Sequence, residues 1–214
     1  MHIPDGMISP KMYIPLHIVN AGLVVYGFKK IQRKIDEKTL PYIASLSALS
    51  FVLMFLQVPL PGGTSVHGVG VAPLAIIFGP WTGFVSISIV LLVQAIFMGV
   101  GGITSFSVNA LCIGFFGSFT AYYTYLLMKK ITGEKPALFI AGFFAIIVAA
   151  FFIALSLGIQ PVIAHSQDGQ PLYFPFGLKT TIPVLLVPHI FVGIGEGLLT
   201  LLIYTFVKKR LHNE

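Results

Sequence analysis

The sequence predicts an all-α, polytopic membrane protein with about seven transmembrane helices. Of its 214 residues, 56% are hydrophobic and only 9% are charged, whereas a soluble domain averages about 25% charged residues. The mean hydropathy is +0.93. The apolar residues fall in long runs that are separated by turns or by short clusters of cations, as in helical membrane proteins. We therefore expect residues 1–214 to form a single membrane domain.

Seven apolar segments are candidate spans. In chain order they are residues 13–28, 40–60, 69–78, 84–98, 103–128, 137–157 and 178–207. The third is too short to cross about 30 Å of hydrocarbon as a straight helix, so we expect it to lie in thinned bilayer or inside the protein. Pro183 and Pro188 are expected to kink the last span.

Clusters of lysine and arginine predict the orientation. They follow the first span (Lys29, Lys30, Arg33, Lys34, Lys38), the fifth (Lys129, Lys130, Lys135) and the seventh (Lys208, Lys209, Arg210). Cytoplasmic loops of membrane proteins are enriched in these residues. We therefore expect the amino terminus outside the cell and the carboxyl terminus in the cytoplasm. The chain must then cross the membrane an odd number of times between the end of the second span and Lys129. The short third segment is therefore expected to cross as well. Topology also accounts for the net charge of +6, so we expect no nucleic-acid partner.

The first two residues form a potential metal chelator. No secretory signal opens the chain, and the bulk of His2 should prevent removal of Met1. The Met1 amine, the His2 amide nitrogen and the His2 imidazole Nδ1 can close a five-membered and a six-membered chelate ring in one plane. Tetragonal nitrogen sites suit Ni(II) or Cu(II), and His67 is the candidate fourth donor. Alternatively, His2 lies in a mobile tail and His67 is an interfacial histidine that faces water.

Five further polar residues are candidates for supporting such a site. Ionisable or polar groups at membrane depth are functional hypotheses by default. Gln94 and Asn109 can bond to a folded-in amino terminus or join two helices. His189 and Glu196 share one helix face and can orient the metal ligands or be purely structural. Asp5 can accept backbone hydrogen bonds that fold the amino-terminal segment, or cap the first helix.

Two smaller features concern packing. Ala44 and Ala48 place small side chains on one face of the second span, where they can admit a partner helix or serve internal packing. Cys112 lies in an apolar run and is expected to be a small core residue.

The opening MHIPDG (residues 1–6), the GGTSVHG segment (62–68) and the following GPW (79–81) resemble the nickel/cobalt substrate-binding S components of energy-coupling factor (ECF) importers, the CbiM/NikM family. The resemblance covers essentially the whole chain, including its length and number of spans. It implies a multi-pass protein of a prokaryotic cell membrane, with an S-component fold and an extra amino-terminal helix. It also implies a metal-binding plug over residues 1–12, a helical bundle over 13–207 and a cytoplasmic tail over 208–214.

The same resemblance implies roles for particular residues and partners. Met1, His2 and His67 would bind Ni(II) or Co(II), and Ala44 and Ala48 would dock on a transmembrane coupling protein. Two ATPase subunits would supply the energy, and the need for a small auxiliary membrane subunit is left open. This chain contains no G-x-x-x-x-G-K-[ST] loop and is expected not to be an enzyme.

Two other functions are compatible with parts of the sequence. A vitamin-binding S component would need an aromatic-lined pocket, which 19 Phe and 8 Tyr would permit, but it has no need of His2 at the start. An intramembrane metalloprotease would need H-E-x-x-H or an equivalent pair, and the spacing of seven between His189 and Glu196 does not match. The choice between nickel and cobalt, and the oligomeric state, are not readable from the sequence.

Overall fold

A computed structural model of the chain describes residues 1–32, 35–60 and 63–211. Some expectations concern residues outside this range. They are two cations of the first cluster (Arg33, Lys34), two residues of the motif and loop before His67 (Pro61, Gly62), and the last three residues of the expected tail (212–214).

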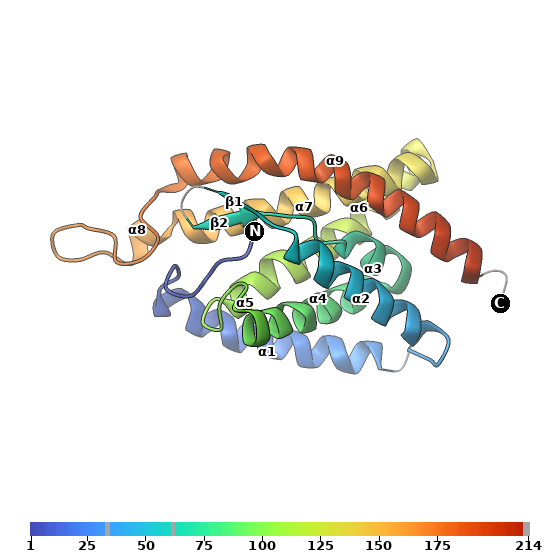
Figure 1. Cartoon of the computed structure of the whole chain (residues 1–214), viewed down its shortest axis with the longest axis horizontal. Helices are drawn as coiled ribbons and strands as arrows, with labels where there is room; N and C mark the ends of the chain where they lie inside the picture. Colours follow the sequence, from blue (N-terminus) through green and yellow to red (C-terminus); the bar gives the residue numbers. More distant parts are fainter. Residues whose placement is uncertain (33–34, 61–62, 212–214) are drawn as a thin grey trace.

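The chain folds into a bundle of helices that run roughly along the long axis of the molecule (Figure 1). The helices are α1 (Pro10–Ile31), α2 (Thr39–Phe55), α3 (Val71–Phe78), α4 (Pro80–Val93), α5 (Phe106–Asn109), α6 (Gly117–Thr132), α7 (Glu134–Gly158), α8 (Gln160–Ile163) and α9 (Leu178–Leu211). Two strands, β1 (Val58–Leu60) and β2 (Thr64–Val66), form an antiparallel hairpin. This architecture confirms the predicted all-α polytopic fold.

Four stretches of helix in the described residues are long and apolar enough to cross a membrane. They are Pro80–Met98, Phe106–Thr132, Glu134–Ile163 and Leu178–Arg210. The first two contain π-helical segments, η1 (Gln94–Met98) and η2 (Ala110–Phe116). Such segments are rare and are frequent at functional sites. The last stretch contains Pro183 and Pro188 within one continuous helix.

The second predicted span is too long by five residues. We expected helix over residues 40–60, but α2 ends at Phe55 and the chain enters the hairpin at Val58. Pro59 lacks a backbone N–H and disfavours helical conformation in the residue before it. The chain therefore turns into extended structure, and Leu60 pairs with Thr64 across the hairpin.

The short third segment is buried by protein. Helix α3 has eight residues and so is only about 12 Å long, far less than the thickness of a bilayer core. All residues from Val71 to Ile76 are buried. The expectation of a protein-buried environment for this segment is therefore confirmed.

Glycines bring α7 and α9 into close contact. A Cβ built on Gly142 would lie 2.7 Å from the carbonyl oxygen of Glu196, and one on Gly197 would lie 2.7 Å from that of Phe139. Real Cβ atoms do not approach oxygen this closely. Small residues at such contacts let two backbones approach, which is how helices associate in membranes.

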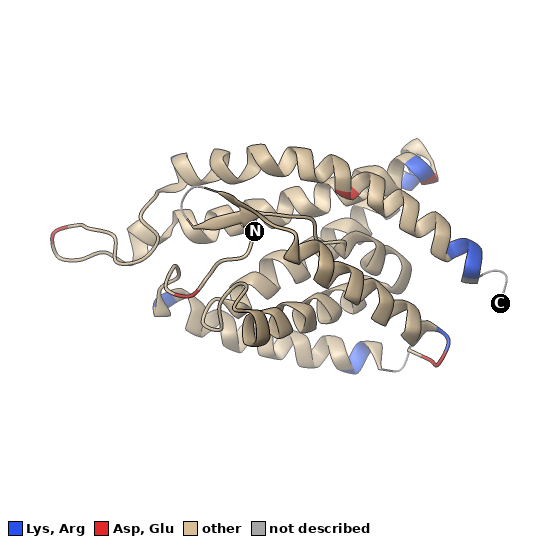
Figure 2. Ribbon diagram, in the orientation of Figure 1, with Lys and Arg blue, Asp and Glu red and all other residues tan. Residues whose placement is uncertain are grey.

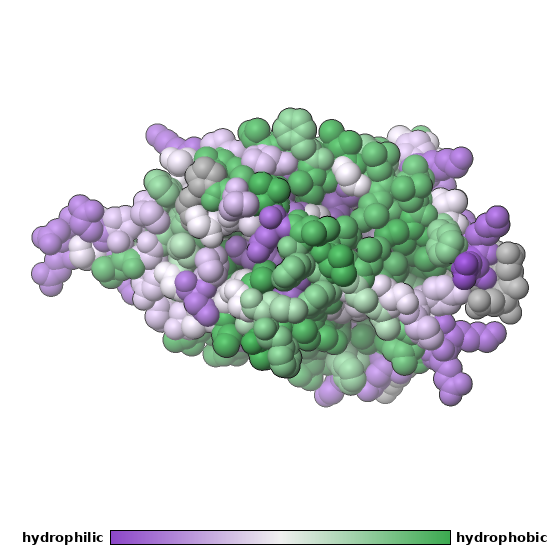
Figure 3. Space-filling view, viewed as in Figure 1, coloured by the Kyte–Doolittle hydropathy of each residue, from purple (hydrophilic) through white to green (hydrophobic). Residues whose placement is uncertain are grey.

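Charge and hydropathy divide the surface. Lys and Arg gather around the end of the molecule where α9 ends, while the opposite end carries fewer charged residues (Figure 2). Between the two ends the visible surface is largely apolar (Figure 3). Among the large apolar side chains, Phe97, Ile18 and Phe191 are more than 70% exposed. Such exposure suits side chains that face lipid.

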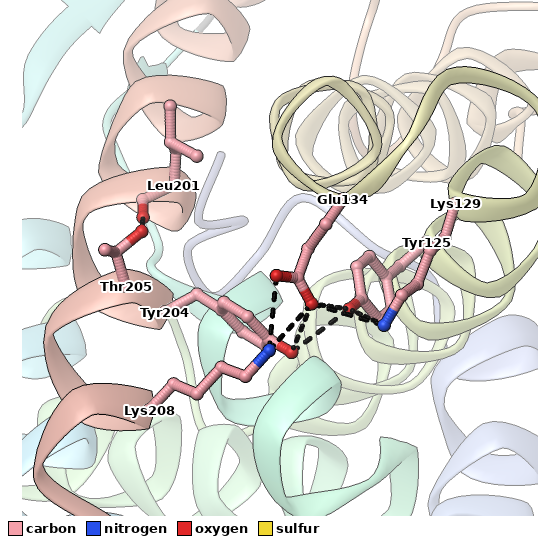
Figure 4. Close-up of polar contacts among 7 residues, drawn as sticks. All are labelled: Tyr125, Lys129, Glu134, Leu201, Tyr204, Thr205 and Lys208. Atoms are coloured by element: carbon pink, nitrogen blue, oxygen red, sulfur yellow. Dashed lines mark hydrogen bonds and ion pairs between the residues drawn. The ribbon is translucent and has the colours of Figure 1, made fainter.

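A polar cluster ties three helices together at the basic end. The Glu134 carboxylate accepts hydrogen bonds from Lys208 (2.9 Å), Lys129 (3.2 Å) and the hydroxyls of Tyr125 and Tyr204 (both 3.3 Å) (Figure 4). These residues come from α6, α7 and α9. The cluster therefore holds these three helices together at the basic end.

Candidate metal centre

The amino-terminal segment folds back into the helix bundle. In Figure 1 the chain begins near β2 and runs through the middle of the molecule to the start of α1. Met1 and Ile3 are fully buried, Ile8 is 2% exposed, and all three belong to the main hydrophobic core. His2 is 4% exposed. The segment is thus an internal plug and not an exposed tail.

Hydrogen bonds from α5 and the turn before it hold the first half of the plug. The backbone N–H of Ile3 donates to Asn109 Oδ1, and Asn109 Nδ2 donates to the Ile3 carbonyl, both at 3.0 Å. The Ser105 hydroxyl donates to the same carbonyl. Asn109 therefore recognises the main chain of the plug, one of the two roles expected for it.

Asp5 fastens the plug to the loop before α5. Its carboxylate accepts hydrogen bonds from the backbone N–H groups of Ile103 (3.1 Å) and Thr104 (2.8 Å) and from the Thr104 hydroxyl. Burial alone would raise the pKa of Asp5, but these hydrogen bonds outweigh it and lower the pKa below 3.8. Asp5 does not cap the first helix, because Ser9 occupies the N-cap position of α1.

Two further contacts hold the second half of the plug. The Ser9 N–H donates to Gln160 Oε1 of α8 at 2.9 Å. The Phe174 N–H donates to the Met7 carbonyl at 3.3 Å. The plug is therefore bonded along most of its length.

Two glycines make room for it. A Cβ on Gly101 would lie 3.4 Å from His2 Cδ2, and a Cβ on Gly102 would lie 2.5 Å from the backbone nitrogen of Asp5. Gly101 also has a φ of +78°, a conformation that L-residues seldom adopt. The Gly99–Gly102 turn, which we had expected only to separate two spans, is thus the wall against which the plug rests.

The proposed donors Met1, His2 and His67 lie together. The terminal amine donates to the Ser65 carbonyl and, at 3.3 Å, to the Ser65 hydroxyl. The His2 and His67 rings stack with centroids 4.5 Å apart and an interplanar angle of 26°. His67 is 2% exposed, so it is not the water-facing histidine of the alternative reading.

Several ring nitrogens in this cluster lack partners. His67 Nδ1 lies 2.9 Å from the Gly68 carbonyl. A carbonyl only accepts, so Nδ1 carries the proton and Nε2 keeps its lone pair. Among the described residues, His67 Nε2 and both ring nitrogens of His2 have no hydrogen-bond partner. Buried polar atoms are rarely left unsatisfied without a functional reason.

Burial keeps these nitrogens uncharged. It lowers the pKa of His2 to about 3, and the neighbouring terminal ammonium adds to this effect. The pKa of His67 is lowered well below its usual value by burial, then by the ammonium and His2. Burial also lowers the pKa of the Met1 amine well below 8.0. At neutral pH the groups can therefore present lone pairs, as metal ligands must.

Three further candidates surround the donors. Gln94 Nε2 donates to the Phe51 carbonyl at 3.0 Å, and the Gln94 side chain is near enough to His2 to raise the pKa of that ring slightly against the effect of burial. His189 is fully buried, with Nδ1 2.6 Å from the Leu185 carbonyl. Its Nε2, like Gln94 Oε1, has no partner among the described residues.

Glu196 acts on the loop that carries His67. Its carboxylate accepts the backbone N–H groups of Val69 and Gly70, the latter at 2.9 Å. The carboxyl oxygens thus bond to main-chain donors two and three residues after His67. This contact fixes the position of the loop, which is a positioning role.

Side chains alone do not make a metal site here. Among the described residues, no three His, Cys, Asp or Glu side chains are grouped to hold a metal ion. The expected donor set differs in kind, because two of its four nitrogens belong to the main chain of Met1 and His2.

Ala44 and Ala48 are both exposed on α2. The internal-packing reading is therefore wrong for this pair. Cys112, in contrast, is 4% exposed and packs in the core, as predicted.

Sequence reasoning missed the residues that receive the plug. They are the amine acceptor Ser65, the plug donors Thr104 and Ser105, the acceptor Gln160, and the close-approach glycines Gly101 and Gly102. Serine and threonine are common in any helix or loop, so they gave no signal. The run Gly99-Val100-Gly101-Gly102 was visible but reads equally well as a turn.

Curated relatives align along nearly the whole chain. A probable fused nickel transport protein, LarMN, of Lactiplantibacillus plantarum is 39% identical over 98% of this chain and 65% of its own length. The fused nickel transport protein NikMN of Rhodobacter capsulatus is 34% identical over 94% of this chain and 59% of its own length. The chain thus spans about three fifths of these fused relatives. The relatives are named as transport proteins.

Structural similarity covers the same extent. A crystal structure of a truncated transition metal transporter superposes with a TM-score of 0.94 at 34% identity, over 98% of this chain and 99% of that one. The family profile for the cobalt uptake substrate-specific transmembrane region matches residues 2–213. With its buried amino terminus, its paired histidines and this match from end to end, the chain belongs to the cobalt uptake substrate-specific transmembrane (CbiM) family.

Proposed function

We propose that this protein is the substrate-binding S component of an ECF importer and that it captures Ni(II) or Co(II) outside the cell. The terminal amine of Met1, the amide nitrogen and imidazole of His2, and the imidazole of His67 are the proposed ligands. One observation carries the proposal. The free terminus is buried against Ser65, with the stacked His2 and His67 rings beside it.

The chemistry of the donors supports a transition-metal cargo. Nitrogen donors in a tetragonal arrangement suit Ni(II), whereas Mg²⁺ and Ca²⁺ prefer oxygen. Binding releases a proton from the His2 amide, and any proton carried by the amine, so affinity should fall as the pH drops. Because burial already lowers the pKa of His2 and of the amine, protons on the ring and the amine compete only at lower pH than in a free peptide.

The proposed partners are a transmembrane coupling protein and two ATPase subunits, which would reorient this subunit and release the ion inside. The exposure of Ala44 and Ala48 on α2 supports a helix-docking role for that face.

The decisive experiment changes only the terminal amine. Nickel and cobalt binding would be measured for the native protein and for its N-formyl form, prepared by blocking deformylation. A second variant would carry one extra methionine before Met1. We expect the affinity of both to fall by much more than tenfold, which corresponds to more than about 1.4 kcal/mol. One extra residue at the carboxyl terminus, with the amine untouched, is the matched control.

Unchanged affinity in the formylated protein would contradict the proposal. The metal would then sit elsewhere, and His67, His189 and Glu196 would become the next site to test. If the protein binds a vitamin, and binds it equally well after formylation, the vitamin-binding function is favoured instead.

A further inference from the structure

A hollow on the surface leads directly to His2. It has a volume of about 450 Å³. Pro4 and Ser65 line it together with His2, Gln57 and Pro59 come from the hairpin side, and Gly101 comes from the turn before α5. Figure 1 shows the chain start between these two structures. The hollow therefore connects solvent with the residue that holds two of the proposed ligands.

The size and lining of the hollow suit a hydrated cation. A divalent ion with six waters occupies about 180 Å³, at about 30 Å³ per water, so the hollow is large enough to hold the ion with its shell. None of the described residues that line the hollow is Asp, Glu, Lys or Arg. The walls thus offer carbonyl, hydroxyl and amide groups that can replace waters, without a charged group that would retain or repel the ion.

The plug itself is fastened elsewhere. Apart from the bond of the Met1 amine to Ser65, its bonds involve Ile3, Asp5, Met7 and Ser9. The described partners of these four residues do not line the hollow. Swinging the plug out to load the metal would break each of these bonds. Access through the hollow breaks none of them.

We propose that this hollow is the port through which the hydrated divalent cation reaches His2, while residues 3–9 stay docked. The proposal rests on the proposed function and adds the route of loading. It also gives a reason for the glycines of the turn. A side chain at position 101 would touch His2 Cδ2 and narrow the inner end of the port.

The test narrows the port after the protein has folded. Val100, which lines the hollow, is replaced by cysteine and modified with methanethiosulfonate reagents that leave either a methylthio or a bulky aromatic group. Native Cys112 is buried and does not compete. The matched control is Leu172→Cys, because Leu172 is 62% exposed in the loop between α8 and α9 but does not line the hollow. Stopped-flow measurements give the rates of Ni(II) association and dissociation.

With the bulky group at position 100, we expect both rates to fall by about tenfold or more relative to the methylthio form. The dissociation constant should change little, because a narrowed passage leaves both end states intact. Neither rate should change at position 172. A Thr104→Val variant, which removes the hydroxyl bond to Asp5, should not load faster than the native protein.

Two results would overturn the port. One is an unchanged association rate with the bulky group at position 100, and the other is faster loading by Thr104→Val, which would show that the plug swings out. If the unmodified protein does not bind nickel, the proposed function fails together with the port.

Discussion

At the residue scale, single polar groups at membrane depth position main-chain atoms. Asn109 pairs with both backbone groups of Ile3, and Glu196 accepts the amides that follow His67. Neither residue needs to contact a metal ion in order to influence metal binding. Their partners are the backbone segments that carry the proposed ligands, so each is expected to act through ligand position.

Glu196→Gln tests this role. A glutamine can keep the oxygen that accepts from both Val69 and Gly70, but it places an NH₂ group where the second oxygen accepts from Gly70 at 3.1 Å. Two donors then face each other, so the loop that carries His67 should shift. We expect metal affinity to fall by about 10- to 100-fold, as measured by nickel titration. Glu37→Gln, at an exposed position, is the control. Equal nickel affinities in the two variants would show that Glu196 does not position the proposed ligands.

Docking of the plug is expected to weaken at low pH, because Asp5 must be ionised to accept its hydrogen bonds. Its pKa is lowered in the folded protein, so its contribution to docking is fully present above the unfolded value of about 3.8 and is lost as the pH falls through the folded value. Hydrogen exchange of the plug amides, corrected for the intrinsic effect of pH, should therefore rise in acid. Asp5→Asn should exchange faster already at neutral pH and vary less in acid. Identical profiles for the two proteins would contradict this role.

At the scale of elements, the plug depends on surfaces contributed by the turn before α5 and by two π-helical segments. Gln94 opens η1 and reaches His2, while Asn109 directly precedes η2 and binds Ile3. Each change of helical register thus coincides with a contact to the plug. This placement could not be read from hydrophobic periodicity, since both residues simply interrupt long apolar runs.

Gly102→Ala should displace the plug. The new Cβ would meet the Asp5 backbone nitrogen at 2.5 Å and also the Asp5 carboxylate, and overpacking of this kind costs about 1–3 kcal/mol. We expect weaker nickel binding and faster proteolysis of residues 1–9 in a protein that still folds. Gly177→Ala, where a Cβ meets nothing within 4 Å, should match the wild type. Native nickel affinity in Gly102→Ala would show that the turn can shift to accommodate the methyl group without displacing the plug.

At the scale of the whole molecule, the distribution of charge predicts the orientation in the membrane. The cations gather at the end that also carries the Glu134 cluster (Figures 2 and 4). The plug and the port lie toward the other end. If the basic end is cytoplasmic, the port opens to the outside, as capture of an external ion requires.

Cysteine labelling in intact cells tests this orientation. Asp168→Cys, in an exposed loop at the end opposite the cations, should react with a membrane-impermeant maleimide. Lys135→Cys should react only after the cells are permeabilised. The buried Cys112 should keep the background low. The reverse pattern of labelling would invert the topology and contradict capture from outside.

The sequence alone was sufficient for the class of fold, the helical segments and the candidate ligands. Apolar runs of membrane length, broken by turns and cations, leave few alternatives, because backbone groups in lipid must be satisfied within helices. The chelating potential of Met1 and His2 is likewise local, since it depends only on two adjacent residues. The end of α2 was misjudged because Leu60 continues the apolar run, although Pro59 cannot continue the helix.

Only the tertiary structure decided which distant residues meet. Ser65, Asn109, Gln160 and Glu196 come from different elements, and each bonds to backbone of the plug or of the His67 loop. A hydrogen bond to the main chain leaves no signature in the partner's side chain, so no pattern in the sequence could reveal these pairs. The close approach at Gly102 is likewise a property of packing. The candidate ligands can therefore be identified from the sequence. Their burial, the hydrogen bonds that position them and the proposed port that leads to them depend on the tertiary structure.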